Sequence, residues 1–294
     1  MTVFLTQNMP PCPMLKKVWP RQRPGRCRAI AVDYGPIALQ AGANLPEMAE
    51  DCLNLNVWTS GLNDGGKRPV MVWLHGGGFS TGSSIESPAY DGENLSKKGD
   101  VVVVSVNHRL NSLGHLDLSA YGEQYKYSAN VGMLDIINAL EWIQANIAEF
   151  GGDPVNVTVF GESGGGAKVL ALMTSPYAQG LFHKGIVESG ATENMGAAFT
   201  SQAASRRAAE ITLANLGIGA DEIEKLQTVS YEELTAASDK ALTQTAEELN
   251  IYEEFVNGYS LLWEPVFFRP GGGAGKPHST AAPTEFPDRR IGAD

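Results

Sequence analysis

The sequence of 294 residues contains only three cysteines, no long apolar run and no long run of lysine or arginine. The cysteines, Cys12, Cys27 and Cys52, are too few for a disulfide framework, and without a C-x-x-C pair they do not indicate a zinc site. No segment approaches the roughly 18 apolar residues of a membrane-spanning helix, and the first residues lack the apolar stretch of a signal peptide. These absences predict a soluble, cytoplasmic protein without a structural metal.

The charge balance narrows the choice of partners. The formal net charge is -11, and lysine and arginine form no long runs. Such a chain lacks the basic surface with which proteins bind nucleic acids or anionic membranes. We therefore expect neither as a partner, and the sequence leaves the oligomeric state open. With 43% hydrophobic residues, the chain can bury a sizeable core.

Strands and helices are expected to alternate from about residue 31 onward. Residues 53–59 alternate like a half-buried strand, and 183–189 predict a further strand. Apolar residues at three- and four-residue steps predict helices at 130–152, which ends on a glycine pair, and at 164–175. Valine-rich runs typical of strands buried on both faces of a parallel sheet lie at 69–75, 100–107 and 155–161. This order predicts an α/β fold whose mostly parallel sheet has helices on both faces.

The two ends of the chain differ from this central region. Residues 1–30 are rich in proline and show no regular period, so we expect an irregular lead-in. Residues 266–294 are rich in glycine and proline, which predicts a disordered tail. The predicted domain therefore covers 31–265. Its last part is expected to be helical at 201–217, 220–230, 231–242 and 246–258.

The stretch VFGESGGGAKV, residues 159–169, places Ser163 in a G-x-S-x-G pattern where a strand meets a helix. This context is that of a nucleophile elbow, in which a sharp turn exposes the serine Oγ. Gly161 and Gly165 are needed because a Cβ at either position would collide with the neighbouring strand or helix. The helix N-terminus also favours developing negative charge. The pattern therefore predicts a nucleophile rather than an ordinary glycine-rich turn.

A second glycine-rich motif, LHGGGFSTGS at 74–83, follows a predicted buried strand. Consecutive glycines leave backbone N–H groups free to donate to the oxyanion of a tetrahedral intermediate. The expected donors are Gly77 and Gly78, joined by Gly164 directly after the nucleophile. The alternative is a flexible loop, which the order and context of the two motifs disfavour.

Five segments resemble the type-B carboxylesterases, the α/β-hydrolase group that includes bacterial para-nitrobenzyl esterases and the cholinesterases. The segments are EDCLNLNVW (50–58), VMVWLHGGGFSTGS (70–83), VVVVSVNHRLNSLGHLDLS (101–119), NVGMLDIINALEWIQANIAEFGGDPVNVTVFGESGGG (130–166) and LFHKGIVESGA (181–191). The resemblance implies the N-terminal half of an α/β-hydrolase fold. It further implies hydrolysis of small carboxylic esters through an acyl-enzyme on Ser163, without a metal or an organic cofactor.

The resemblance also implies roles for residues around the motifs. Glu162 would be a buried carboxylate beside the nucleophile, and Ser189 would belong to a hydrogen-bond network behind the triad. Arg109 and Asp135 would form a structural ion pair. The family often pairs the cysteine of EDC with an upstream cysteine that this sequence lacks, so Cys52 is expected to be a free thiol.

The family's catalytic acid and histidine follow the serine in chain order, and the resemblance stops before both. None of the five histidines matches the catalytic one. Three match structural positions, one is expected to be partly buried at the start of a strand, and the last lies in the predicted tail without strand or helix context. In chain order they are His75, His108, His115, His183 and His278. Glu285 likewise follows no apolar strand, so the triad Glu and His are expected to be missing from a truncated chain.

Two classes of function therefore stay open. One is a serine carboxylesterase that uses Ser163. The other is a catalytically inactive remnant or a cholinesterase-like binding module. The intact serine argues against a dedicated binding module, whereas the missing base argues for inactivity. A separate polypeptide that supplies the missing half is a third possibility.

Overall fold

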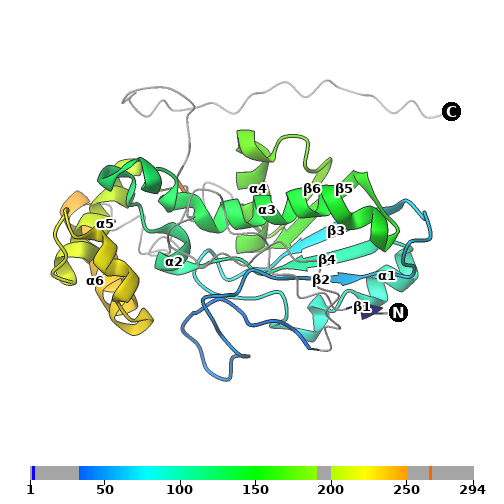
Figure 1. The fold of residues 1–294 in the computed structure, drawn as a ribbon, viewed down its shortest axis with the longest axis horizontal. Coiled ribbons are helices and arrows are strands. Elements are labelled where there is room, and N and C mark those ends of the chain that lie inside the picture. The colour runs from blue at the N-terminus through cyan, green and yellow to red at the C-terminus, as the bar shows by residue number, and fades with distance from the viewer. Residues whose placement is uncertain (1, 4–32, 191–199, 251–264, 267–294) are drawn as a thin grey trace.

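A computed structural model describes residues 2–3, 33–190, 200–250 and 265–266 of the protein. Its centre is a six-stranded sheet in the order β1-β2-β4-β3-β5-β6 (Figure 1). The strands are β1 (Thr2–Val3), β2 (Leu55–Trp58), β3 (Arg68–Leu74), β4 (Val102–Val106), β5 (Gly152–Glu162) and β6 (Lys184–Glu188). The β1–β2 and β2–β4 pairs are antiparallel, and β4, β3, β5 and β6 are mutually parallel. The predicted mostly parallel sheet is thus confirmed.

Two strand predictions were wrong in detail. β2 is buried along its whole length rather than half-buried, because Asn56 on its polar side donates hydrogen bonds to the hydroxyls of Ser84 and Ser105. Thr2–Val3 forms a strand within the expected irregular lead-in, paired with Val57 and Trp58. Two-residue pairing needs only backbone groups, so no side-chain period could have indicated it. The other residues of the lead-in and nearly all of the predicted tail lie outside the described part of the chain.

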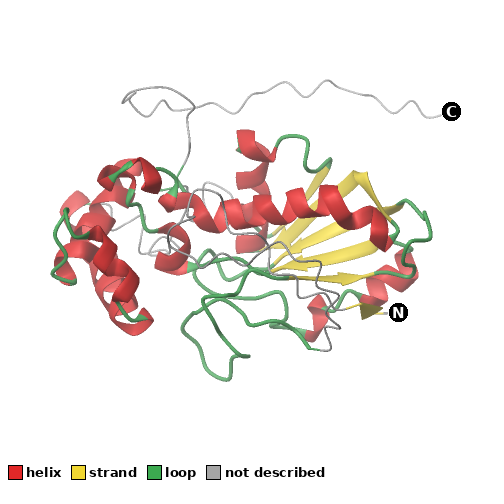
Figure 2. Ribbon diagram, viewed as in Figure 1, coloured by secondary structure: helices red, strands yellow, loops and turns green. Residues whose placement is uncertain are grey.

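Helices cover both faces of the sheet, as predicted (Figure 2). The α-helices are α1 (Glu93–Gly99), α2 (Asn111–His115), α3 (Val131–Asn146), α4 (Gly164–Thr174), α5 (Gln202–Asn215) and α6 (Tyr231–Leu249). The 3₁₀ helices are η2 (Pro88–Tyr90), η3 (Ser119–Tyr121), η4 (Glu123–Tyr125), η5 (Ser128–Asn130), η6 (Ile147–Phe150), η7 (Pro176–Ala178) and η8 (Ile223–Thr228). Side chains of α3 and α4 share the main core with one face of the strands. On the other face, Gly92 at the start of α1 lies against Trp58 and Val103.

The long helix ends where its glycines predict. α3 continues into η6, and Gly151 then takes the left-handed conformation with φ 71°. Glycine adopts this conformation without a Cβ penalty, so it ends the helix and lets the chain enter β5. The apolar face of α3, including Ile136, Leu140 and Ile143, is completely buried against the sheet. The predicted periodicity therefore places this helix correctly.

The helices after the sheet form a separate antiparallel pair, which Figure 1 shows beyond α2. α5 begins at the capping residue Ser201 and is followed by Gly217, as predicted. The segment expected to be a helix at 220–230 is instead the 3₁₀ helix η8. α6 runs without a break to Leu249, so the helix expected at 231–242 and the first residues of the helix expected at 246–258 form one helix. No helix among the described residues is long and apolar enough to span a membrane.

Cys52 is a free thiol in the main core, as predicted. Burial, together with the charge of Asp135, raises the pKa of the thiol to about 12. At pH 8 roughly one Cys52 in 10⁴ is then a thiolate, which is the reactive form. We expect Cys52 to react with iodoacetamide at least about 100-fold more slowly in the native protein than in urea. The measurement uses a variant with Cys12→Ser and Cys27→Ser, and equal rates in the two states would contradict it.

Candidate active site

Ser163 lies at the turn that joins β5 to α4. Its backbone has φ 52° and ψ -122°, a conformation that costs a non-glycine residue about 1–3 kcal/mol. Two hydrogen bonds hold the turn: the Ser163 N–H donates to Glu188 O at 2.9 Å, and Ser163 O accepts from Ala167 N at 3.2 Å. The Ser163 hydroxyl bonds to no residue in the described part of the chain. It is therefore held on a sharp turn with its oxygen free to react.

The glycines on either side allow strand and helix to approach closely. A Cβ on Gly161 would lie 2.6 Å from both Leu74 O and the Gly165 carbonyl carbon. A Cβ on Gly165 would lie 2.0 Å from Leu74 O. Real Cβ atoms do not come this near to a backbone oxygen, so both positions require glycine.

The glycine loop after β3 packs directly on this turn. A Cβ on Gly164 would lie 2.4 Å from Gly78 N, and one on Gly76 would lie 3.5 Å from Ser163 Cβ. Gly77 and Gly78 have φ 77° and 60°, which favour glycine. The N–H groups of Gly77, Gly78 and Gly164 donate to no described residue. The glycine loop thus packs against the serine turn, as an oxyanion site built from these three N–H groups would require.

The family model described as "Carboxylesterase family" matches residues 5–267. The chain belongs to the carboxylesterase family. The α/β-hydrolase fold expected from the sequence is thereby also shown, because solved para-nitrobenzyl esterases share it with this chain.

Individual relatives are 39–45% identical to this chain over the parts that match. The chain is 45% identical over 232 residues to a para-nitrobenzyl esterase of Bacillus subtilis, covering 76% of this chain and 45% of that protein. Chicken (Gallus gallus) acetylcholinesterase is 43% identical over 165 residues, which are 56% of this chain and 21% of that protein. A solved thermophilic para-nitrobenzyl esterase superposes with a TM-score of 0.68 at 39% identity, covering 80% of this chain and 47% of that one. The chain thus spans less than half the length of each of these relatives.

Three histidines of this chain are buried and form hydrogen bonds with the backbone. In each, Nδ1 faces a carbonyl oxygen: Gly76 O for His75 at 2.9 Å, Arg109 O for His108 at 2.9 Å and Ala129 O for His115 at 3.0 Å. A carbonyl only accepts hydrogen bonds, so Nδ1 carries the proton in all three rings. Burial lowers the pKa of His75 and His108 well below the usual value, and that of His115 to about 4. These rings are neutral structural groups, as expected from the sequence.

Two side chains near the elbow differ from their predicted environments. Glu162 is exposed rather than buried, because it is the last residue of β5 and lies beside β6, which is exposed along its whole length. His183 is also exposed rather than partly buried, because it precedes the same exposed strand. Its Nδ1 accepts a hydrogen bond from Val157 N at 3.2 Å. Ser189 follows β6, is exposed and has φ 48°.

Arg109 and Asp135 lie together. Arg109 Nε donates to Asp135 Oδ2 at 2.8 Å, Nη2 donates to Oδ1 at 2.5 Å, and the Arg109 backbone N–H donates to Oδ2 at 3.1 Å. The carboxylate is completely buried, and the arginine side chain is 12% exposed. This two-pronged ion pair ties the segment after β4 to helix α3.

One charged residue near the site was missed by the sequence analysis. Lys168 in α4 is completely buried, and its Nζ donates to His75 O at 2.9 Å and Gly78 O at 2.7 Å. Both acceptors belong to the glycine loop. The only signal in the sequence is a single lysine inside an otherwise apolar helix, GGGAKVLALMT.

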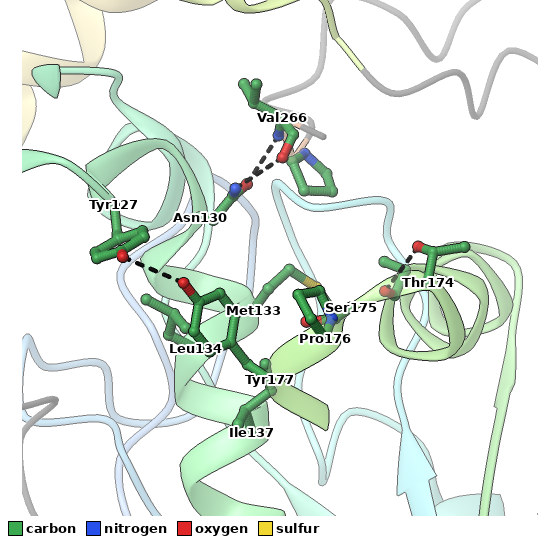
Figure 3. Close-up of a pocket in the computed structure, with 12 residues that line it drawn as sticks. Tyr127, Asn130, Met133, Leu134, Ile137, Thr174, Ser175, Pro176, Tyr177 and Val266 are labelled. Atoms are coloured by element: carbon green, nitrogen blue, oxygen red, sulfur yellow. Dashed lines mark hydrogen bonds between the residues drawn. The ribbon is translucent and has the colours of Figure 1, made fainter. Parts of the chain in front are cut away.

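Two cavities lie away from Ser163. One cavity, of about 60 Å³, lies between the N-terminal part of α3 and the C-terminal end of α4 (Figure 3). Asn130, which lines it, forms two 2.8 Å hydrogen bonds through its side chain with the Val266 backbone. The other, of about 210 Å³, is lined by residues that include Cys52, Arg109 and Tyr231. Ser163 lines neither of them. Among the described residues no cluster of histidine, cysteine, aspartate and glutamate could hold a metal ion.

Proposed function

We propose that this protein hydrolyses carboxylic esters, with Ser163 as the nucleophile. The observation that supports the proposal is the contact between the Ser163 turn and the glycine loop, where the Ser163 hydroxyl and the N–H groups of Gly77, Gly78 and Gly164 have no hydrogen-bond partner among the described residues. Attack of Ser163 Oγ on an ester carbonyl would form a tetrahedral oxyanion. Gly77, Gly78 and Gly164 would stabilise it, the alcohol would leave, and water would then hydrolyse the acyl-enzyme. The substrates would be small uncharged carboxylic esters.

Serine attack also needs a base to take the hydroxyl proton. His75, His108 and His115 do not fit this role, because each is buried and already donates from Nδ1 to a carbonyl. This observation favours a second candidate, a chain that binds esters but turns them over slowly or not at all by itself. A separate polypeptide that supplies an acid and a histidine would restore full activity. Without such a base, an oxyanion site alone gives only a small rate enhancement.

Replacing Ser163 by alanine separates the two candidates. We expect the purified chain to hydrolyse para-nitrophenyl acetate weakly and to bind a fluorophosphonate probe covalently, and we expect Ser163→Ala to lose both. Peptide mass mapping of the adduct checks the site of labelling. The control is Ser60→Ala, an exposed serine whose hydroxyl bonds to Asp100, which should leave both signals unchanged. Hydrolysis that survives in Ser163→Ala would refute Ser163 as the nucleophile, and a chain without either signal would favour the inactive alternative.

A further inference from the structure

Lys168 is a buried cation that the esterase mechanism above does not use. Its Nζ has two carbonyl acceptors, His75 O and Gly78 O, and lies 5.4 Å from the centre of the Phe79 ring. No carboxylate forms a salt bridge with it among the described residues. Burying an ammonium group costs stability unless strong hydrogen bonds compensate. A lysine at this position is therefore expected to serve the loop that it contacts.

We propose that Lys168 is a positioning residue that holds the glycine loop with its N–H donors turned toward Ser163. The proposal rests on the proposed function, because it assigns a role in the same oxyanion site. It concerns the orientation of four successive peptide groups, from the one that follows His75 to the one that follows Gly78.

The carbonyl oxygen of each of these peptide groups accepts a hydrogen bond. Lys168 binds the first and the last, through His75 O and Gly78 O. The two between them are held locally: the His75 ring binds Gly76 O, and Gly77 O accepts from the N–H groups of Ser80 at 3.3 Å and Thr81 at 3.1 Å. Lys168 thus secures both ends of the stretch whose centre carries the proposed donors.

The direction of the donors follows from the carbonyls. All described peptide bonds are trans, and in a trans peptide the N–H points opposite to the C=O. The Gly77 N–H therefore points opposite to Gly76 O, which the His75 ring binds, and the Gly78 N–H points opposite to Gly77 O, which accepts from Ser80 and Thr81. Gly78 N lies against Gly164, at the start of α4. Lys168 does not bind the carbonyls of these two peptide groups themselves, but by holding His75 O and Gly78 O on either side of them it fixes the ends of the segment that carries the donors next to the serine turn.

The groups around Lys168 make its charge sensitive to pH near neutrality. Burial lowers the pKa of Lys168 to about 7, and Glu86 acts in the opposite direction. The other titratable neighbours are His75, His108 and His115, whose own pKa values are lowered and which stay neutral. Lys168 is thus charged below about pH 7 and loses a proton above it, so the grip on the two carbonyls weakens as pH rises.

The test replaces Lys168 by methionine, which keeps the length of the side chain and removes its donors. We expect kcat for para-nitrophenyl acetate to fall about 10- to 100-fold while KM changes less than about threefold, because the loss affects the transition state. For Lys168→Gln, which retains one donor group, kcat should lie between the values of the wild type and Lys168→Met. The matched control is Lys184→Met in the exposed strand β6, where the lysine bonds only to Asn156 among the described residues. It should leave both constants unchanged.

Hydrogen exchange tests the loop without relying on turnover. The amides of Thr81 and Gly82 are protected by hydrogen bonds to Gly77 O and to the Gln40 side chain. Lys168→Met should speed their exchange about tenfold or more while the amides of β4 keep their protection, whereas global destabilisation would speed both. In the wild type, exchange corrected for its intrinsic pH dependence should accelerate between pH 6 and 9, and in Lys168→Met it should not.

The outcomes distinguish this proposal from the proposed function. A wild type without esterase activity whose loop loosens in Lys168→Met would refute the function and leave the loop assignment standing. An active wild type whose kcat and loop exchange are unaffected by Lys168→Met would overturn the role of Lys168. A variant that unfolds is replaced by Lys168→Gln in the same measurements, and unchanged loop exchange there would also overturn it.

Discussion

Gly165→Ala is expected to lower the free energy of unfolding by more than about 3 kcal/mol. The added Cβ would lie 2.0 Å from Leu74 O, 2.9 Å from Leu74 C and 3.1 Å from His75 O. All three atoms belong to the backbone at the end of β3, which is paired with both β4 and β5. Neither strand nor helix can move by this much without breaking sheet hydrogen bonds. The loss is measured by urea denaturation followed by circular dichroism.

Gly99→Ala is the matched control for this prediction. Gly99 also lies in a helix, α1, but a Cβ there would have its nearest neighbour at 3.5 Å, an ordinary contact. Alanine has a higher helix propensity than glycine, so stability should be unchanged or rise slightly, by up to about 1 kcal/mol. Equal stabilities of Gly165→Ala and the wild type would show that the helix can sit farther from β3 than the structure has it.

The sequence could predict this part of the fold because its constraints are local. The glycines at 161 and 165 belong to a short strand–turn–helix pattern that is visible within a few residues, although Leu74 O, which both contact, lies far away in the sequence, and the valine runs reflect burial on both faces of each strand. The ends of α3 and α5 could also be predicted, because glycine and serine act on the adjacent backbone. Such features depend on a few neighbouring residues, so their spacing is visible in one sequence.

Features that depend on distant neighbours could not be predicted in this way. The exposure of Glu162 and His183 is set by the edge position of β6, and no local pattern tells an edge strand from a central one. The role of Lys168 could not be predicted either, because a sequence does not show that carbonyls of a loop some 90 residues earlier lie within hydrogen-bond distance of its Nζ. The same limit applies to α6, which continues past the point where its apolar pattern weakens.

Asp135→Asn is expected to lower the free energy of unfolding by about 3–5 kcal/mol. The Asp135 carboxylate accepts three hydrogen bonds from Arg109, two from the guanidinium and one from the backbone N–H. An asparagine keeps the volume but turns an NH₂ group toward one set of donors and leaves a largely buried guanidinium without its counter-charge. The change should appear as a lower urea midpoint with an unaltered slope.

Two further variants decide whether the loss comes from the unpaired charge. Glu93→Gln makes the same acid-to-amide change in an exposed pair with Lys97 and should leave the midpoint unaltered. Adding Arg109→Met to Asp135→Asn should recover part of the lost stability, because it removes the cation that Asp135 neutralises in the wild type while keeping most of the side-chain volume. If the double variant were no more stable than Asp135→Asn, the loss would instead reflect the missing tie between β4 and α3. The ion pair would then stabilise the protein by joining the sheet that carries Ser163 to α3, and not by neutralising a buried charge.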